Sequence, residues 1–364
     1  MSDASTLAAD VPSVDNSSSA DLPGEPTSRN RWIASAVVIA IFAILPQLVS
    51  TTQTDRIAGW FPMALTALSL ALLTGFYGQI SLGHGALYGV GAYTAAIAVN
   101  EWDFPYLGAM VLATVVAFVA GLVIGLPALR IKGLHLALVT LTVAMLFPQL
   151  INKFDDVTGG TTGLKVGETV KNALGGEKFQ SIEFTAPDWT GLNNNQWRYY
   201  WLFAFTILAV LVVRNIVTSR TGRALVAIRD NETAAAVSGI NVAKTKVLTF
   251  GLSSALAGLA GSLYMLLITT QTEGLSSGKF DLTLSLYLLV AVVIGGSQSI
   301  AGPLIGTFII VFTRDIITPE LPKRLHELMP LIFGVSLITT MFTAPGGIVG
   351  MFRHTVEKIR AKGH

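Results

Sequence analysis

Long apolar runs separated by short polar turns dominate this chain. Each run is close to the length, about 20 residues, that an α-helix needs to cross a bilayer. Only 13% of the residues are charged, against about 25% in ordinary soluble domains. Because backbone polar groups find no water inside a bilayer, such runs have to fold as helices. The sequence therefore predicts an all-α polytopic membrane protein with about ten transmembrane helices.

Glycines interrupt one of these runs. The predicted spans cover residues 32–49, 57–74, 78–99, 106–126, 134–151, 199–217, 247–270, 282–295, 304–317 and 328–342. The third contains Gly78, Gly83, Gly85, Gly89 and Gly91, and glycine disfavours a uniform helix. We expect a loop or a glycine-broken half-helix near 78–91. For most of these glycines we favour the other explanation, that small residues let helices pack closely.

Basic residues in the short loops indicate the orientation. Arg29 and Arg31 precede the first run, and lysines and arginines of short loops stay on the cytoplasmic side. We expect both termini inside. Residues 1–30 are interpreted as a disordered cytoplasmic tail, 31–350 as the transmembrane domain and 351–364 as a basic cytoplasmic tail. Residues 152–198 form the one sizeable external loop, long enough for a small amount of structure of its own.

A polar island at 218–246 separates two apolar runs. Its basic residues outnumber Asp230 and Glu232, which places it in the cytoplasm. These basic residues are Arg220, Arg223, Arg229, Lys244 and Lys246. Asp230 is suited to cap a short helix, Glu232 to occupy the positive end of its dipole, and Gly239 to end it. The island is either a helix that transmits force from a soluble partner or an anchor held by lipid headgroups.

The sequence carries almost no catalytic chemistry. It has no nucleotide-binding G-x-x-x-x-G-K-[ST] loop, because Gly278-Lys279 is followed by Phe280. It has no G-x-S-x-G or H-E-x-x-H motif, and its five histidines lack metal-ligand spacing. Cysteine is absent, which excludes disulfides and thiolate metal sites. We expect no catalytic, cofactor-binding or metal residues, no ATP binding by this chain, and no nucleic-acid partner.

Charged groups inside the predicted spans are few. Asp315 is the only carboxylate, and it lies beside Arg314, so a mutual ion pair is expected. This scarcity argues against ion-coupled transport. His84 lies among glycines where a substrate pathway could pass; alternatively, it is a neutral histidine bonded to a neighbouring helix. Other polar groups of the same stretch are pathway candidates or helix–helix contacts: Gln79, Ser81, Tyr88 and Tyr93. Energy must come from elsewhere, or the protein is a channel.

Five segments resemble one family. They are GQISLGHGALYGVGAYTAA at 78–96, LRIKGLHLALVTLTVAML at 129–146, TGGTTGL at 158–164, GRALVAIRDNETAAAVSGINVAKTKVLTFGLSSALAGLAGSLY at 222–264 and VVIGGSQSIAGPLIGTF at 292–308. Together they resemble, in the right order, the LivM-type permeases of branched-chain amino-acid ABC importers.

The resemblance implies an ABC-importer permease architecture in a bacterial plasma membrane. It also implies several partners: a second, LivH-like permease, two cytoplasmic ABC ATPase subunits that hydrolyse ATP, and an extracytoplasmic solute-binding protein. In that family the island corresponds to the loop that docks on the ATPase, although the run from Glu232 to Ala236 fits the usual Glu-Ala-Ala pattern only with a shift of one position. The coupling residues implied are Gly222, Arg223, Arg229, Asp230, Glu232, Ala235 and Gly239.

The function that follows is import of branched-chain or other apolar amino acids by an ATP-driven complex. A urea or short-amide importer permease is the alternative within the same class. A stand-alone channel or secondary carrier is the alternative from another class. A membrane enzyme ranks last, because the sequence shows no nucleophile–base pair and no metal constellation.

Overall fold

The computed structural model describes residues 28–127, 134–171, 177–181, 184–268, 274–317, 322, 328–344 and 346–352. It divides into two units, residues 1–48 and 49–364, which we describe separately. In the first unit the described element is helix α1 (Ser28–Leu48), which coincides with the first predicted span. Residues 1–27 of the predicted N-terminal tail, and 353–364 of the predicted basic tail, lie outside the described residues.

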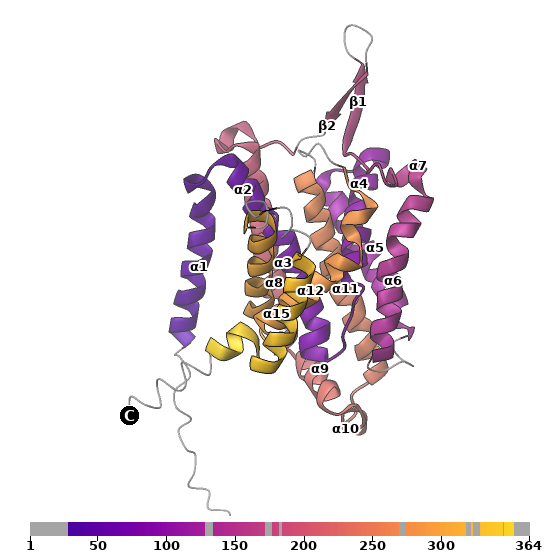
Figure 1. Cartoon of the computed structure of the whole chain (residues 1–364), viewed down its shortest axis with the longest axis vertical. Helices are drawn as coiled ribbons and strands as arrows, with labels where there is room; N and C mark the ends of the chain where they lie inside the picture. The colour runs from indigo at the N-terminus through magenta and orange to yellow at the C-terminus, as the bar shows by residue number, and fades with distance from the viewer. Residues whose placement is uncertain are drawn as a thin grey trace, which may run out of the picture. The chain divides into compact units, whose positions relative to one another are not determined.

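Helices make up almost all of the second unit (Figure 1). They are α2 (Thr51–Ala58), α3 (Trp60–Ala71), the π-helix η1 (Leu72–Tyr77), α4 (His84–Trp102), α5 (Tyr106–Gly125), α6 (Leu134–Lys153), α8 (Asn194–Thr218), α9 (Arg220–Asp230), α10 (Glu232–Val237), α11 (Val242–Ile268), α12 (Leu282–Gly295), α13 (Ala301–Phe312) and α15 (Met329–Thr343). Each predicted span overlaps a helix. Among the described residues, 7 helical segments are long and apolar enough to cross a membrane. The chain is a multi-pass membrane protein, and the count of about ten spans stays a prediction.

The predicted external loop has structure of its own. It contains α7 (Asp155–Thr158), strands β1 (Gly167–Lys171) and β2 (Glu177–Ser181), and the short 3-10 helix η3 (Asp188–Thr190). The strands pair antiparallel, with Gly167 opposite Ser181. This hairpin is an addition to the expected all-helical fold. It projects from one end of the helical unit, and α9 and α10 lie at the opposite end (Figure 1).

Helices α3 and α11 form the centre of the unit. Every residue of α3 is buried, and α11 makes its most extensive contacts with α5 and α4. Small residues lie where these helices cross. A Cβ added at Gly91 would overlap the backbone of Gly258, and one at Gly261 would overlap the carbonyl of Tyr88. Such close backbone approach is how helices associate in lipid, where apolar surface alone gives little attraction.

The glycine-broken segment is shorter than expected. Its non-helical part is 78–83, between η1 and α4, and Gly78 ends η1 at a φ of 79° that few other residues adopt. From His84 onward α4 is continuous, and its three glycines face neighbouring helices closely. Packing therefore explains Gly85, Gly89 and Gly91, and the expectation of a break up to residue 91 was wrong.

Replacing Gly91 by leucine tests the close crossing of α4 and α11. The new side chain would overlap the Gly258 backbone, which cannot move without separating the two helices. We expect a loss of about 3 kcal/mol or more in unfolding free energy, at the upper end of overpacking costs. The measurement is thermal unfolding of the purified protein in detergent.

The matched control is Gly334→Leu in α15, where an added Cβ meets nothing within 4 Å. It should unfold close to the wild-type temperature. Equal stability of the two variants would contradict the close crossing.

Candidate functional site

The polar island folds into two short capped helices, α9 and α10. Ser219 caps α9 by accepting a hydrogen bond from the Thr221 amide at 3.1 Å. Asn231 caps α10 by accepting from the Ala234 amide at 3.0 Å. The expectation that Asp230 provides this cap was wrong. Asp230 is the last residue of α9, whereas the extended backbone that a cap requires occurs at Asn231.

The other two expectations for the island, a carboxylate at the start of the second helix and a glycine at its end, match the structure. Glu232 begins α10, where a carboxylate faces the positive end of the helix dipole. Gly239 lies just beyond α10 at a φ of 85° and its amide bonds to the Ala236 carbonyl. This left-handed turn is a common helix ending that favours glycine.

Arg229 connects α9 to the membrane helices. Its Nη1 donates to the Gly75 carbonyl at 3.1 Å, and its aliphatic stem lies against Gly78. Gly75 in turn lies so close to the Ser297 carbonyl that a Cβ would overlap it. The island, the end of η1 and the turn before α13 therefore meet at one junction. Arg229 also contacts Asp230 at 3.1 Å.

A second contact fixes the island to α11. The Lys246 Nζ lies 2.9 Å from Glu232 Oε1, and the Lys246 side chain is only 2% exposed. Glu232 remains 31% exposed. The sequence placed Lys246 in a basic cytoplasmic segment and did not indicate that its side chain is buried and paired. Because a buried charge is costly without its partner, this pair holds α10 firmly against α11.

The other implied coupling residues are placed as follows. Gly222 permits the tight turn between α8 and α9, since a Cβ there would overlap the Val217 carbonyl. Ala235 is buried in an apolar cluster with Leu225 and Ile228 of α9. Arg223 is exposed on α9.

His84 is fully buried between two serines. Its Nε2 lies 2.8 Å from Ser253 Oγ on α11, and its Nδ1 lies 3.0 Å from Ser81 Oγ. Ser253 must donate its single proton to the Ser69 carbonyl, 2.6 Å away, so it accepts from His84 Nε2–H. The histidine thus ties α4 to α11 and, through Ser253, to α3. This is the packing role considered as the alternative to a pathway role.

The remaining pathway candidates differ in position. Ser81 and Tyr93 are buried, and the Tyr93 hydroxyl donates to the Leu275 carbonyl at 2.7 Å. Gln79 is half-buried, and its Oε1 has no hydrogen-bond partner among the described residues. Tyr88 lines a cavity. The substrate pathway stays a prediction.

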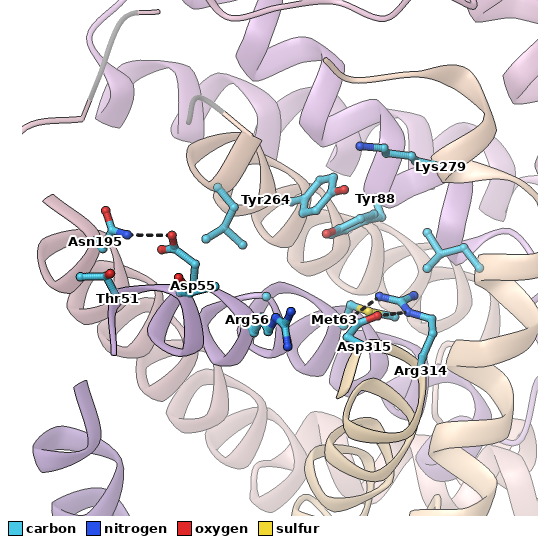
Figure 2. Close-up of a pocket in the computed structure, with 14 residues that line it drawn as sticks. Thr51, Asp55, Arg56, Met63, Tyr88, Asn195, Tyr264, Lys279, Arg314 and Asp315 are labelled. Carbon is cyan, nitrogen blue, oxygen red and sulfur yellow. Dashed lines mark hydrogen bonds and ion pairs between the residues drawn. The ribbon is translucent and has the colours of Figure 1, made fainter. Parts of the chain in front are cut away.

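A polar pocket of about 730 Å³ lies at the α2 end of the unit, away from α9 and α10 (Figures 1 and 2). Its charged lining residues are Asp55, Arg56, Lys279, Arg314 and Asp315. Tyr88 and Tyr264 add aromatic rings whose centres are 5.4 Å apart. The sequence pointed to Arg314 and Asp315 as a pair, but it did not indicate that distant charges converge on one cavity.

Two ion pairs organise this pocket. Arg314 Nε and Nη2 donate to the two carboxylate oxygens of Asp315 at 2.6 and 3.0 Å, which confirms the expected mutual pair. Asp55 accepts from Asn195 at 2.7 Å and lies 3.6 Å from the buried guanidinium of Arg198. Among the described residues there is no group of three or more metal-ligating side chains.

The unit thus combines several membrane-length helices with a polar pocket at one end and a firmly attached polar loop at the other, features that a membrane transporter can use. Residues 54–341 match the family described as "Branched-chain amino acid transport system / permease component". The chain therefore belongs to this permease family. A transport permease is not in itself an enzyme.

The curated relatives agree with the family match. The high-affinity branched-chain amino acid transport system permease protein LivM of Salmonella typhimurium is 26% identical over 343 residues, which cover 91% of this chain and 77% of the relative. LivM of Escherichia coli is 25% identical over the same shares. The probable branched-chain amino acid transport permease protein LivH of Methanocaldococcus jannaschii is 26% identical over 79% of this chain and 89% of the relative. The resemblance to LivM-type permeases is confirmed. No solved structure matches the chain.

Replacing Ser253 by alanine tests the histidine bridge. The change leaves the buried His84 Nε2 without its hydrogen-bond partner and removes the hydroxyl that donates to the Ser69 carbonyl. We expect a loss of about 1–3 kcal/mol in unfolding free energy. Ser262→Ala is the matched control, because Ser262 is equally buried on α11 but bonds to the Leu259 carbonyl of its own helix. Similar unfolding temperatures for the two variants would refute the bridge.

The pair of Lys246 and Glu232 predicts an asymmetric response. Glu232→Gln leaves a buried ammonium without its counter-charge, at a cost of about 3–5 kcal/mol. Lys246→Met leaves a carboxylate that water can still reach, so its loss should be smaller. Thermal unfolding in detergent measures both.

The double variant should recover part of the loss caused by Glu232→Gln alone. Glu101→Gln, an exposed carboxylate on α4, is the control and should change little. If Lys246→Met lowers the unfolding temperature more than Glu232→Gln does, the prediction is wrong, because the Lys246 ammonium is then not the costly buried charge.

Proposed function

We propose that this chain is the permease subunit of an ATP-driven importer for branched-chain or other apolar amino acids. The family and the LivM relatives support the substrate class over urea or short amides, since the relatives' names refer to branched-chain amino acids. The observation that carries the proposal is the attachment of α9 and α10 to two central helical segments.

The attachment is what a coupling element needs. A soluble motor transmits movement only through a loop that cannot bend independently of the membrane helices. Arg229 bonds to the end of η1, and Glu232 pairs with Lys246 of α11. A push on α9 and α10 would therefore move both segments together. A juxtamembrane anchor held by lipid would need no buried ion pair.

The proposed complex has the composition that the family resemblance implies. Two cytoplasmic ATPase subunits hydrolyse ATP, α9 and α10 form the loop that docks on the ATPase, and a LivH-like permease completes the pathway. An extracytoplasmic solute-binding protein delivers substrate at the opposite end. This arrangement has about ten spans and both termini in the cytoplasm of a bacterial cell.

The test is ATP-dependent leucine uptake by cells that lack this chain and have no redundant importer. Wild-type protein should restore uptake. Arg229→Ala, which removes the bond to Gly75, should reach the membrane at normal levels but reduce uptake about tenfold or more, because a charge-assisted hydrogen bond is lost. ATP hydrolysis by the purified complex should continue.

Lys153→Ala, which removes an exposed cation at the end of α6, is the control and should support normal uptake. Uptake that does not depend on this chain would overturn the proposed function. Normal uptake with Arg229→Ala would remove only the coupling role of that residue.

A further inference from the structure

The pocket at the α2 end combines an ion pair with apolar walls. We propose that it binds the zwitterionic head of an apolar α-amino acid, with Arg314 receiving the carboxylate and Asp315 the ammonium. The inference rests on the proposed function and assigns to this chain a substrate site of its own. Figure 2 shows the pair beside Met63, with Tyr88 and Tyr264 nearby.

The pair is available to a ligand. Arg314 and Asp315 side chains are 36% and 35% exposed, although they lie at the end of a membrane helix. They bond to each other, and neither has another hydrogen-bond partner among the described residues. Both belong to a π-helical turn, η5 (Thr313–Ile317), a geometry often found at functional sites.

The other acidic group of the pocket is already engaged. Asp55 accepts from Asn195 and lies close to the Arg198 guanidinium, which is 1% exposed. A ligand ammonium at Asp55 would compete with a buried, permanently charged arginine. Asp315 has no such second cation among the described contacts, so it is the better ammonium partner.

Adjacent opposite charges are the complement of a zwitterion. An α-amino acid carries its carboxylate and its ammonium on the same carbon. An arginine–aspartate pair can meet both at once, because each protein charge exchanges its partner for an equivalent ligand group. A carboxylic acid without the amine would leave Asp315 unpaired, and an amine without the carboxylate would leave Arg314 unpaired. The pair therefore selects against both.

The walls fit an aliphatic side chain. Met63, Leu267 and Leu284 line the pocket together with the Tyr88 and Tyr264 rings. The volume of about 730 Å³ lies within the usual range for small-ligand sites, so a branched-chain amino acid fits with water. The flexible Met63 side chain adapts its shape readily. The pocket would therefore accept several apolar ligand side chains and not a single one.

A phosphatidylethanolamine headgroup shares this chemistry, since it carries an ammonium and a phosphate. The ligand source is therefore part of the test. The chain has no cysteine, so a single introduced thiol can be labelled without background from this chain. Met63→Cys places that thiol in the pocket.

The experiment labels Met63→Cys with a thiol reagent, in the complete complex held in phosphatidylcholine nanodiscs. Leucine should slow labelling, whereas 4-methylpentanoate (no amine) and isopentylamine (no carboxylate) should not. Adding Arg314→Gln should raise the leucine concentration for half-protection about tenfold or more. Adding Lys153→Gln, an exposed cation outside the pocket, should leave protection unchanged.

Three results would overturn the site. They are no labelling at all, equal protection by all three compounds, and unchanged protection with Arg314→Gln. Protection in phosphatidylethanolamine nanodiscs without leucine would assign the pocket to a lipid and also overturn it. If protection fails while the same complex still imports leucine, the proposed function stands and only this site is wrong. Loss of uptake in the wild-type complex would instead defeat the proposed function.

Discussion

Close contact between helix backbones is the constraint on which this structure depends. In lipid, apolar surfaces gain little by meeting each other, so helices associate where small residues let them approach. Helix α11 provides these contacts on several sides, with Gly258 against α4 and α5 and Gly261 against Tyr88. Close packing on several sides restrains local bending of α11, whose 27 residues extend about 40 Å.

Helix α11 carries candidate functional residues near its start, in its middle and near its end. Lys246 lies near its first turn and holds α10, Ser253 in its middle receives His84, and Tyr264 near its end lines the pocket. The segment from α2 to η1 runs alongside in the same way, from Asp55 at the pocket to the Gly75 carbonyl at Arg229. Helix α11 and the segment from α2 to η1 thus connect the loop with the pocket. Because Ser253 of α11 donates to the Ser69 carbonyl of α3, a displacement at one end would be carried by both.

The helical runs could be predicted because a bilayer forces backbone hydrogen bonds into helices wherever apolar residues continue. The pairing of Arg314 with Asp315 was also predictable, since two opposite charges next to each other in an apolar run have no other partner nearby. The burial of Lys246 was not. Lysine in a basic loop is usually solvated, and its burial depends on a chain reversal at Gly239 that places Glu232 beside it. The convergence of distant charges on one pocket depends likewise on helix order in space.

A pair of opposite charges inside a membrane protein need not imply ion coupling. A lone carboxylate in lipid has to bind a proton or a cation, and its occupancy then follows the ion gradient. Arg314 and Asp315 satisfy each other, so no ion is required. A zwitterion that displaces this mutual contact exchanges one set of ion-pair bonds for an equivalent set. Its binding free energy then comes mainly from the apolar surface that its side chain buries. Binding at the proposed site would then be weak and readily reversed, and in the proposed importer the driving energy would come from the ATPase partners.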